Sequence, residues 1–319
     1  MAKRYLSGIQ PSGQLHLGNY FGAIRAHIER QDNAFYFIAD YHALTTTHDA
    51  AALRRYTHEV AATYLALGLD PARATLWRQS DVPEVQELAW LLATVTGMGL
   101  LERAHSFKDK RERGIQPSVG LFYYPVLMAA DILAFDSDVV PVGKDQVQHL
   151  EMTRDMAQSY NAVYGEVLRL PSFELGVPEV VPGVDGAKMS KSYDNHIPIF
   201  ARGKALKQRV MAIKTDSTPM EAPKDPETCT VFALYRLFAD AGQQAAMRAK
   251  YAGGNYGYGH AKLELLELIE ARFAEARARF EELMAHPERV DAILRAGAER
   301  ARPVARAVLD RARRACGLS

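Results

Sequence analysis

Hydrophobic positions follow two different spacings along the first two thirds of the chain. Short apolar runs alternate with stretches in which apolar residues recur every three or four positions, and these spacings indicate strands and helices respectively. The runs predict strands at 4–9, 34–39, 75–77 and 138–142. The stretches between them predict helices at 21–28, 53–64 and 84–95, with a further long helix after 142. Alternation of strand and helix is typical of a parallel sheet, which binds its ligand at the carboxyl ends of the strands.

The strand signal fades after about residue 186. Apolar residues from Leu266 to Met284 step by three or four, which predicts one amphipathic helix. The segment 290–316 predicts two more helices, because Pro303 interrupts its pattern. The glycines of GGNYGYGH (253–260) fit a turn before the long helix better than a phosphate cradle. We therefore predict an α/β domain followed by an α-helical domain.

The composition is that of an ordinary globular protein. The 319 residues are 48% hydrophobic and 24% charged, and this length favours about two domains. Lys and Arg number 39 against 38 Asp and Glu, so no overall basic field indicates a polyanionic partner, although a local patch could still bind phosphate. The two cysteines, Cys229 and Cys316, are too few for a disulfide scaffold or a cysteine-rich metal site and fit a reducing compartment.

The chain carries no visible signal for secretion or membrane insertion. Its first residues are basic, but no apolar segment follows them. The most apolar run, 121–135, contains Asp131 and is shorter than the ~20 residues that a membrane span requires. We expect a cytoplasmic protein that makes no contact with a membrane.

The first chemistry-bearing segment is SGIQPSGQLHLGNY (7–20), which follows a predicted strand and precedes a predicted helix. Its glycines allow a close approach of the backbone to a ligand, and the amides at a helix N-terminus suit phosphate. His16 could donate to phosphate oxygens, with Gln10 and Asn19 as further polar groups. The alternative is a glycine-rich turn that only caps the helix. Neither a G-x-G-x-x-G fingerprint nor a Walker A sequence occurs.

The second segment is KMSKS (188–192), preceded by Gly183 and Gly186. Two lysines and two hydroxyls on a glycine-flanked loop form a mobile cationic clamp, which could neutralise charge on a departing polyphosphate. The alternative is a solvated basic loop. A match to one given pentapeptide in a chain of this length arises by chance on the order of once in ten thousand sequences, so the segment is a specific signal.

Together these motifs resemble the signatures of the class I aminoacyl-tRNA synthetases. HLGN (16–19) looks like the HIGH signature of that class, with Asn in place of the last His, and KMSKS is unchanged. With YYPVLMAADIL (123–133), VPVGKDQVQHLEMTRD (140–155) and KMSKSYDN, the chain more closely resembles the bacterial tryptophanyl-tRNA synthetases. The resemblance implies a Rossmann-like catalytic domain at 1–186 with a dimer-forming insertion. It also implies that 187–319 holds the KMSKS loop and a helical anticodon-binding domain. The last helix of that domain could pack back on the catalytic domain.

The resemblance also implies the reaction and its partners. The carboxylate of L-tryptophan would attack the α-phosphate of ATP, pyrophosphate would leave, and the aminoacyl group would move to the 3′ end of tRNA(Trp). Mg²⁺ would accompany ATP, with no structural metal bound by the protein. The enzyme would be a homodimer, with its interface around 91–102 and 121–127.

The residues implied by the resemblance form three groups. The catalytic group is His16, Lys188, Ser190 and Lys191. The ATP-binding group is Gln10, Pro11, Ser12, Gly18, Asn19, Gly143, Lys144, Asp145, Lys188, Met189, Ser190, Lys191 and Ser192. The tryptophan-binding group is Leu6, Gly8, Tyr124, Met128, Asp131, Val140, Val142 and Gln146.

Asp131 is the residue on which the choice of amino acid depends. It is a carboxylate inside an otherwise nearly apolar run, and an unpaired buried charge is costly. Indole offers one N–H donor, so a carboxylate at the floor of a pocket fits tryptophan and is left unsatisfied by phenylalanine. Tyrosine could also donate to it, and Asp131 could instead lie on the solvent face of a helix. Tyrosine specificity therefore remains as an alternative function. A non-catalytic paralogue and a small-molecule adenylyltransferase are two further alternatives.

Three further sets of residues have two interpretations each. Lys108 and Lys110 could hold pyrophosphate or could belong to a solvated charged stretch. Tyr41 and His42 could be functional or part of the core. The C-terminal arginines, opposed in sequence only by Asp310, could contact tRNA phosphates or form a charged helix face; they are Arg302, Arg306, Arg311, Arg313 and Arg314.

Overall fold

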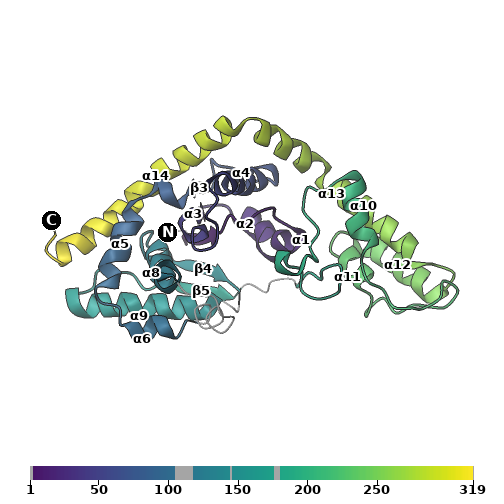
Figure 1. Cartoon of the computed structure of the whole chain (residues 1–319), viewed down its shortest axis with the longest axis horizontal. Coiled ribbons are helices and arrows are strands. Elements are labelled where there is room, and N and C mark those ends of the chain that lie inside the picture. Colours follow the sequence, from purple (N-terminus) through teal and green to yellow (C-terminus); the bar gives the residue numbers. More distant parts are fainter. Residues whose placement is uncertain (1–2, 105–117, 144–145, 176–179, 319) are drawn as a thin grey trace.

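The computed structural model describes residues 3–104, 118–143, 146–175 and 180–318 (Figure 1). Its centre is a parallel sheet of five strands in the order β3-β2-β1-β4-β5. The strands are β1 (Tyr5–Ile9), β2 (Ala34–Ile38), β3 (Thr75–Arg78), β4 (Val139–Val142) and β5 (Ser172–Leu175). This order confirms the predicted Rossmann-like sheet. The direction of strand addition reverses between β1 and β4, and the crevice at such a point is where open α/β sheets bind ligands.

The four strands predicted from apolar runs are all present, and β5 is the strand that the pattern missed. β2 is buried at every position, because helices cover both faces of the sheet there. β5 has the sequence SFEL, lies at the edge of the sheet and has no fully buried residue. Because none of its residues is fully buried, the hydrophobic pattern does not reveal it, whereas β3 at the other edge has two buried residues.

Helices follow each strand of the sheet. The turn after β1 leads into α1 (Leu17–Asn19), a π-helical turn (Tyr20–Ile24) and α2 (Arg25–Glu29). The other helices of this half are α3 (Asp40–Ala43), α4 (Ala50–Ala66), α5 (Glu84–Ala93), α6 (Met98–Glu102), α8 (Val119–Leu133) and α9 (Val147–Tyr164). The second half contributes α10 (Gly203–Met211), α11 (Thr230–Tyr235), α12 (Ala241–Gly253), α13 (Tyr258–Ala285) and α14 (Pro287–Ala315). This confirms the expected helical C-terminal region.

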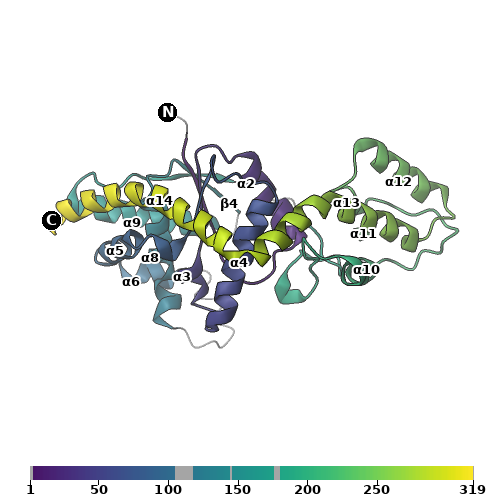
Figure 2. The same ribbon diagram turned by 90° about the horizontal axis from the view of Figure 1, so that it is seen from above.

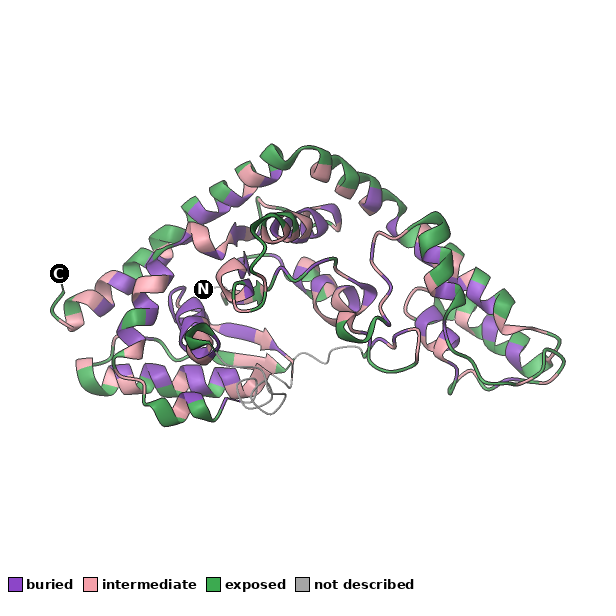
Figure 3. Ribbon diagram, viewed as in Figure 1, coloured by how far each residue is buried: buried purple, intermediate pink, exposed green. Residues whose placement is uncertain are grey.

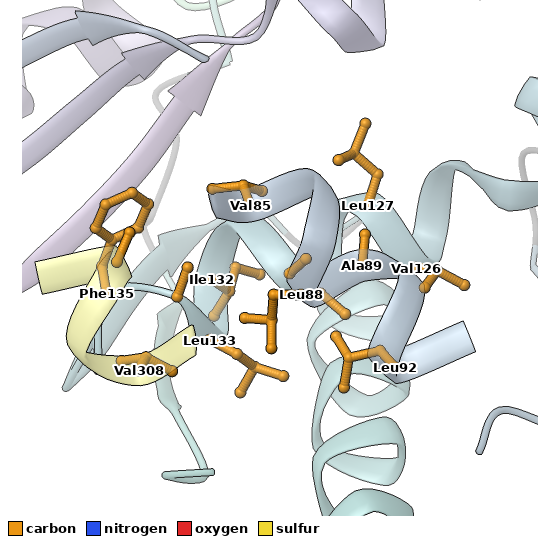
Figure 4. Packing of buried hydrophobic residues seen from close by; sticks show 14 of the residues in the cluster. Val85, Leu88, Ala89, Leu92, Val126, Leu127, Ile132, Leu133, Phe135 and Val308 are labelled. Carbon is orange, nitrogen blue, oxygen red and sulfur yellow. The ribbon is translucent and has the colours of Figure 1, made fainter. Parts of the chain in front are cut away.

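One hydrophobic cluster joins the sheet to α5, α8 and α14. Leu88 and Leu92 of α5 lie among side chains of α8, and Val308 of α14 closes the group (Figure 4). The second cluster joins α4 to α11 and α13 on the other side of the sheet. Each cluster contains residues from both sides of position 186, so the core is not interrupted there. The domain boundary at 186 stays a prediction.

The last helix differs from the prediction. Instead of two helices broken near Pro303, α14 is continuous and runs along one side of the molecule (Figures 1 and 2). Pro303 lies on the solvent face of α14, where water can satisfy the carbonyl that loses its partner, and Figure 3 shows the exposed and buried stripes of this helix. Burial of one face of α14 stabilises the helix by more than Pro303 destabilises it. The buried residues of this face include Leu294, Ala298, Ala301, Ala305, Val308 and Ala312.

In the structure, carboxylates other than Asp310 oppose the C-terminal arginines. Arg302 Nη2 lies 2.9 Å from Glu84 Oε1, and Arg306 lies 3.6 Å from the same carboxylate. Arg311 pairs with Asp136 at 2.8 Å, and Arg313 pairs with Glu87. These ion pairs fasten α14 to the sheet-containing half. Of this group, Arg314 has no ion pair within the described part of the chain.

Within the described ranges, no helix combines the length and hydrophobicity needed to cross a bilayer.

Candidate active site

A cavity of about 470 Å³ opens at the carboxyl ends of β1 and β4, where strand order reverses. The structure brings all eight residues of the predicted tryptophan-binding group to its lining, although they come from β1, α8, β4 and the start of α9. Gln10 and Gly143 of the predicted ATP-binding group also line it. The lining that sequence reasoning did not predict includes Ser7, Phe37, Thr45 and His149.

Asp131 lies at the wall of this cavity and is 1% exposed. Its Oδ2 accepts a hydrogen bond from His42 Nε2 at 2.9 Å, and Gln79 Nε2 donates to both carboxylate oxygens at 2.8 Å. Burial raises the pKa of Asp131, while the hydrogen bonds from His42 and Gln79 lower it. A carboxylate has about four acceptor sites, so these bonds leave capacity for one donor from the cavity.

The sequence alone left the role of His42 open and did not identify Gln79. His42 follows β2, and its ring lies on the cavity wall with its hydrogen bond directed to Asp131. Gln79 is the first residue after β3. Its position at the carboxyl end of a predicted parallel strand was the available signal, but only the fold shows that it reaches Asp131.

Gly8 is required by the close approach of Phe37. A Cβ placed on Gly8 would lie 2.4 Å from Phe37 Cζ, so the aromatic ring lies directly on the backbone of β1. Phe37 in turn packs against Trp77 with ring centroids 5.7 Å apart. The cavity wall is therefore fixed from behind by core packing.

Tyr124 and His149 close the opposite side of the cavity. Tyr124 Oη and His149 Nε2 lie 2.6 Å apart and join α8 to α9. Both residues line the cavity, so a polar group of a ligand can meet either of them there.

The two signature segments lie against each other although about 170 residues separate them in sequence. Leu17 N donates to Ile197 O at 3.0 Å, and Ile199 N donates to Leu15 O at 3.1 Å. Gly18 N also donates to Met189 Sδ at 3.3 Å, and Met189 is buried in the second hydrophobic cluster. HLGN and the segment around KMSKS therefore form one continuous surface.

Lys191 connects the KMSKS segment to the turn after β1. Its Nζ donates to Ser12 O at 2.9 Å, to Ser12 Oγ at 3.2 Å and to Gly13 O at 3.3 Å. Burial lowers the pKa of Lys191, while Glu59 raises it. Because Gln10 lines the cavity and Ser12 is only two residues further on, the cavity and the lysine adjoin along the same turn.

The remaining KMSKS residues are organised around Asn195, which is buried. Ser190 N donates to Asn195 Oδ1 at 2.7 Å, and Asn195 Nδ2 donates to Lys188 O at 3.1 Å. Ser190 Oγ accepts from Ser192 N at 3.2 Å and starts a single 3₁₀ turn. The Lys188 side chain is exposed, so it can move while the backbone of the loop stays fixed.

His16 is buried at the start of α1. Burial lowers its pKa to about 4, and the charges of Lys191 and His196 add to that effect. Its ring is therefore neutral near pH 7, and its Nδ1 has no partner among the described residues. Asn19 Oδ1 accepts from the His16 backbone N at 3.0 Å, so Asn19 has a capping role, and its part in ATP binding stays a prediction.

The other predicted residues fall into two sets. Pro11 is buried in the turn, and Ser12 and Ser192 are exposed. Lys144 and Asp145 of the ATP-binding group, and Lys108 and Lys110, lie outside the described residues. Among the residues that are described, no three or more His, Cys, Asp or Glu side chains gather as a metal site would require.

Comparison with known proteins agrees with this geometry. The family described as tRNA synthetases class I (W and Y) matches residues 2–274, and the chain belongs to that family.

The individual relatives narrow the class to one amino acid. A tryptophan–tRNA ligase of Rhodopirellula baltica is 54% identical over 318 residues, which cover 99% of each chain. One from Fusobacterium nucleatum is 52% identical over 99% of this chain and 98% of its own. The tryptophanyl-tRNA synthetase of Campylobacter jejuni, solved in complex with ADP and tryptophan, superposes with a TM-score of 0.95 at 49% identity, covering 99% and 100% of the two chains.

Proposed function

We propose that the chain performs the reaction of these relatives as a tryptophan–tRNA ligase. It activates L-tryptophan with ATP to tryptophanyl-adenylate and pyrophosphate, and then transfers tryptophan to the 3′ end of tRNA(Trp). The observation that carries the proposal is the buried Asp131 carboxylate in a cavity that adjoins the contact between HLGN and KMSKS. The cysteine content fits the cytoplasm as the compartment of this reaction.

Asp131 selects the amino acid in this proposal. The indole ring lies between the apolar walls, with Met128 beside it, and its N–H donates to the carboxylate. His42 and Gln79 hold that carboxylate in place before the substrate arrives. Phenylalanine has no side-chain donor and would leave the Asp131 carboxylate without a hydrogen bond. A buried acceptor without its donor discriminates strongly against such an analogue.

Charge neutralisation supplies most of the catalysis. The carboxylate of tryptophan attacks the α-phosphorus of ATP as the bond to pyrophosphate breaks, a reaction that needs positioning rather than a protein nucleophile. His16 donates to a phosphate oxygen, and Lys188 and Lys191 take up the charge on pyrophosphate. Lys191 must first exchange its bonds to Ser12 and Gly13 for bonds to the phosphates. Mg²⁺ enters with ATP as part of the substrate.

A second copy of the chain is the proposed partner at the surface formed by α5, α6 and α8. Trp90, Met98 and Val119, one from each of these helices, are large apolar side chains that are 66%, 64% and 82% exposed. Met98 lies within the predicted interface segment 91–102, Trp90 directly precedes it, and Val119 lies two residues before the segment 121–127. Sedimentation equilibrium should give a dimer that Met98→Glu weakens, and a monomeric wild-type chain would contradict this part of the proposal.

The experiment that tests the function is ATP–pyrophosphate exchange, measured with tryptophan and with tyrosine. We expect exchange with tryptophan only, followed by charging of purified tRNA(Trp). Asp131→Asn should raise the KM for tryptophan by about 10- to 100-fold, the value of one hydrogen bond to a charged group, with little change in the KM for ATP. Asp155→Asn, a change at an exposed position of α9, is the matched control. Exchange with tyrosine, or equal loss of affinity for both substrates, would refute the assignment.

A further inference from the structure

A second cavity, of about 290 Å³, lies between α4, the segment that ends at Leu15, the segment 198–201 and α13. Its volume is near the lower end of the roughly 300–1,000 Å³ that is usual for small-molecule sites. It shares no residue with the lining of the cavity that contains Asp131. No step of the proposed reaction uses it.

The lining of this second cavity is partly apolar, with an aromatic pair at one wall; its polar members are Gln14, Glu59, Thr63 and Glu281. Phe200 and Phe280 stack with ring centroids 4.5 Å apart and an interplanar angle of 30°. Leu15 and Pro198 complete the apolar surface. Aromatic faces attract cations as well as apolar groups.

Glu59 adds an incompletely satisfied carboxylate to this lining. Its Oε2 is buried and has no hydrogen-bond partner among the described residues, and its Oε1 lies 3.8 Å from Arg55 Nε, beyond hydrogen-bonding distance. Burial raises the pKa of Glu59, while Arg55 and Lys191 lower it. The second carboxylate of the cavity, Glu281, already pairs with Arg202 at 3.1 Å. Glu59 is therefore the group that gains most from a new donor.

We propose that this cavity is a second ligand site, which takes a small organic ammonium ion that carries an apolar or aromatic group. The ammonium donates to Glu59, and the apolar group packs on Phe200 and Phe280. An anionic ligand is disfavoured by the two carboxylates of the lining.

The second cavity lies next to the segments that form the proposed ATP site, so a ligand bound in the cavity can affect that site. Leu15 precedes His16, and the Ile199 amide that bonds to Leu15 belongs to the segment that follows KMSKS. A ligand in the cavity would contact both sides of this junction. Its affinity and the affinity for ATP are therefore expected to depend on each other.

The test measures binding of phenethylamine to the full chain by calorimetry, with saturating L-tryptophan present to fill the cavity at Asp131. The carboxylate of tryptophan disfavours its entry into the second cavity, because Glu59 and Glu281 line that cavity. We expect one saturable site, and phenethyl alcohol, which has the same ring but no charge, should bind about tenfold more weakly. Glu59→Gln should weaken the binding of phenethylamine by a similar factor. Ala205→Phe, which fills the cavity from an exposed position of α10, should abolish binding.

Glu275→Gln is the matched control, because Glu275 is exposed on α13 and does not line the cavity. This variant should bind phenethylamine as the wild type does. The proposal is overturned if tryptophan-saturated protein shows no saturable binding. It is equally overturned if Glu59→Gln or Ala205→Phe leaves the affinity unchanged.

Discussion

α14 approaches β3 closely at Gly297, and this contact allows a quantitative prediction. A Cβ at Gly297 would lie 1.8 Å from Leu76 O and 2.6 Å from Leu76 C. An ordinary contact between carbon and a carbonyl oxygen is ~3.3 Å, so Gly297→Ala requires α14 to move away from β3 by roughly 1.5 Å. The ion pairs of Arg302 with Glu84 and of Arg311 with Asp136 oppose this movement on the same helix.

The expected cost follows from the packing that the movement opens. A radial gap of about 0.5–1 Å already removes a quarter to a half of the dispersion energy of a contact. The buried side chains next to Gly297, Leu294 and Ala298, would both lose contacts in this way. Overpacking costs about 1–3 kcal/mol, and the upper end applies here because the clash is with backbone. Since alanine favours the helix over glycine by about 1 kcal/mol, we expect a net loss of ~2 kcal/mol in the free energy of unfolding.

Urea denaturation at fixed protein concentration measures this loss. Trp77, which follows Leu76 in β3, is 1% exposed and serves as the fluorescent reporter once Trp90 is replaced by Phe, because the chain has two tryptophans. The matched control is Gly259→Ala on α13, where a Cβ meets nothing within 4 Å, and this variant should be as stable as the parent or slightly more stable. If Gly297→Ala unfolds at the same urea concentration as the parent, the close packing of α14 on β3 is refuted.

Three further predictions concern the site and the core. Gly8→Ala should raise the KM for tryptophan about tenfold or more, because the new Cβ displaces the Phe37 ring into the cavity; an unchanged KM would contradict the described wall. Lys191→Met should lower kcat about 100-fold and leave tryptophan binding intact, whereas a kcat within twofold of wild type would exclude the proposed role in charge neutralisation. Burial lowers the pKa of His27 from 6.5 to about 4, so the unfolded chain binds the proton first as pH falls. The contribution of His27 to the free energy of unfolding is therefore fully present above pH 6.5 and is lost as the pH falls toward 4. This contribution decreases by about 2 kcal/mol between about pH 7.5 and pH 5. His27→Phe should remove that part of the pH dependence in urea titrations, and a slope equal to that of wild type would refute this assignment.

Local patterns in the sequence were sufficient for the central strands and for the two signatures. β2 is buried at all five positions, and β3 and β4 also contain consecutive buried residues, so the burial of these strands is visible as consecutive apolar residues. In β1 only Leu6 is fully buried. The turn after β1 and the KMSKS loop have residue types that suit phosphate without reference to any distant segment. The burial of Asp131 was likewise suggested by the apolar residues on either side of it.

Other features required the tertiary structure, because they depend on residues that are far apart in the sequence. Gln79 and Asp131 lie in the connection from β3 to β4, whereas His42 lies in the connection from β2 to β3, so the contacts of Asp131 join residues that are 52 and 89 positions apart. The continuity of α14 is decided by a buried stripe that packs on β3 and α5. Local propensity at Pro303 predicted the opposite, since helix propensity measures the isolated segment and not the surface it covers. The sequence by itself therefore determined which groups are candidates for the chemistry of this protein. The packing of distant segments decided which partners hold those groups, because contact free energies between distant residues leave no periodic pattern along the chain.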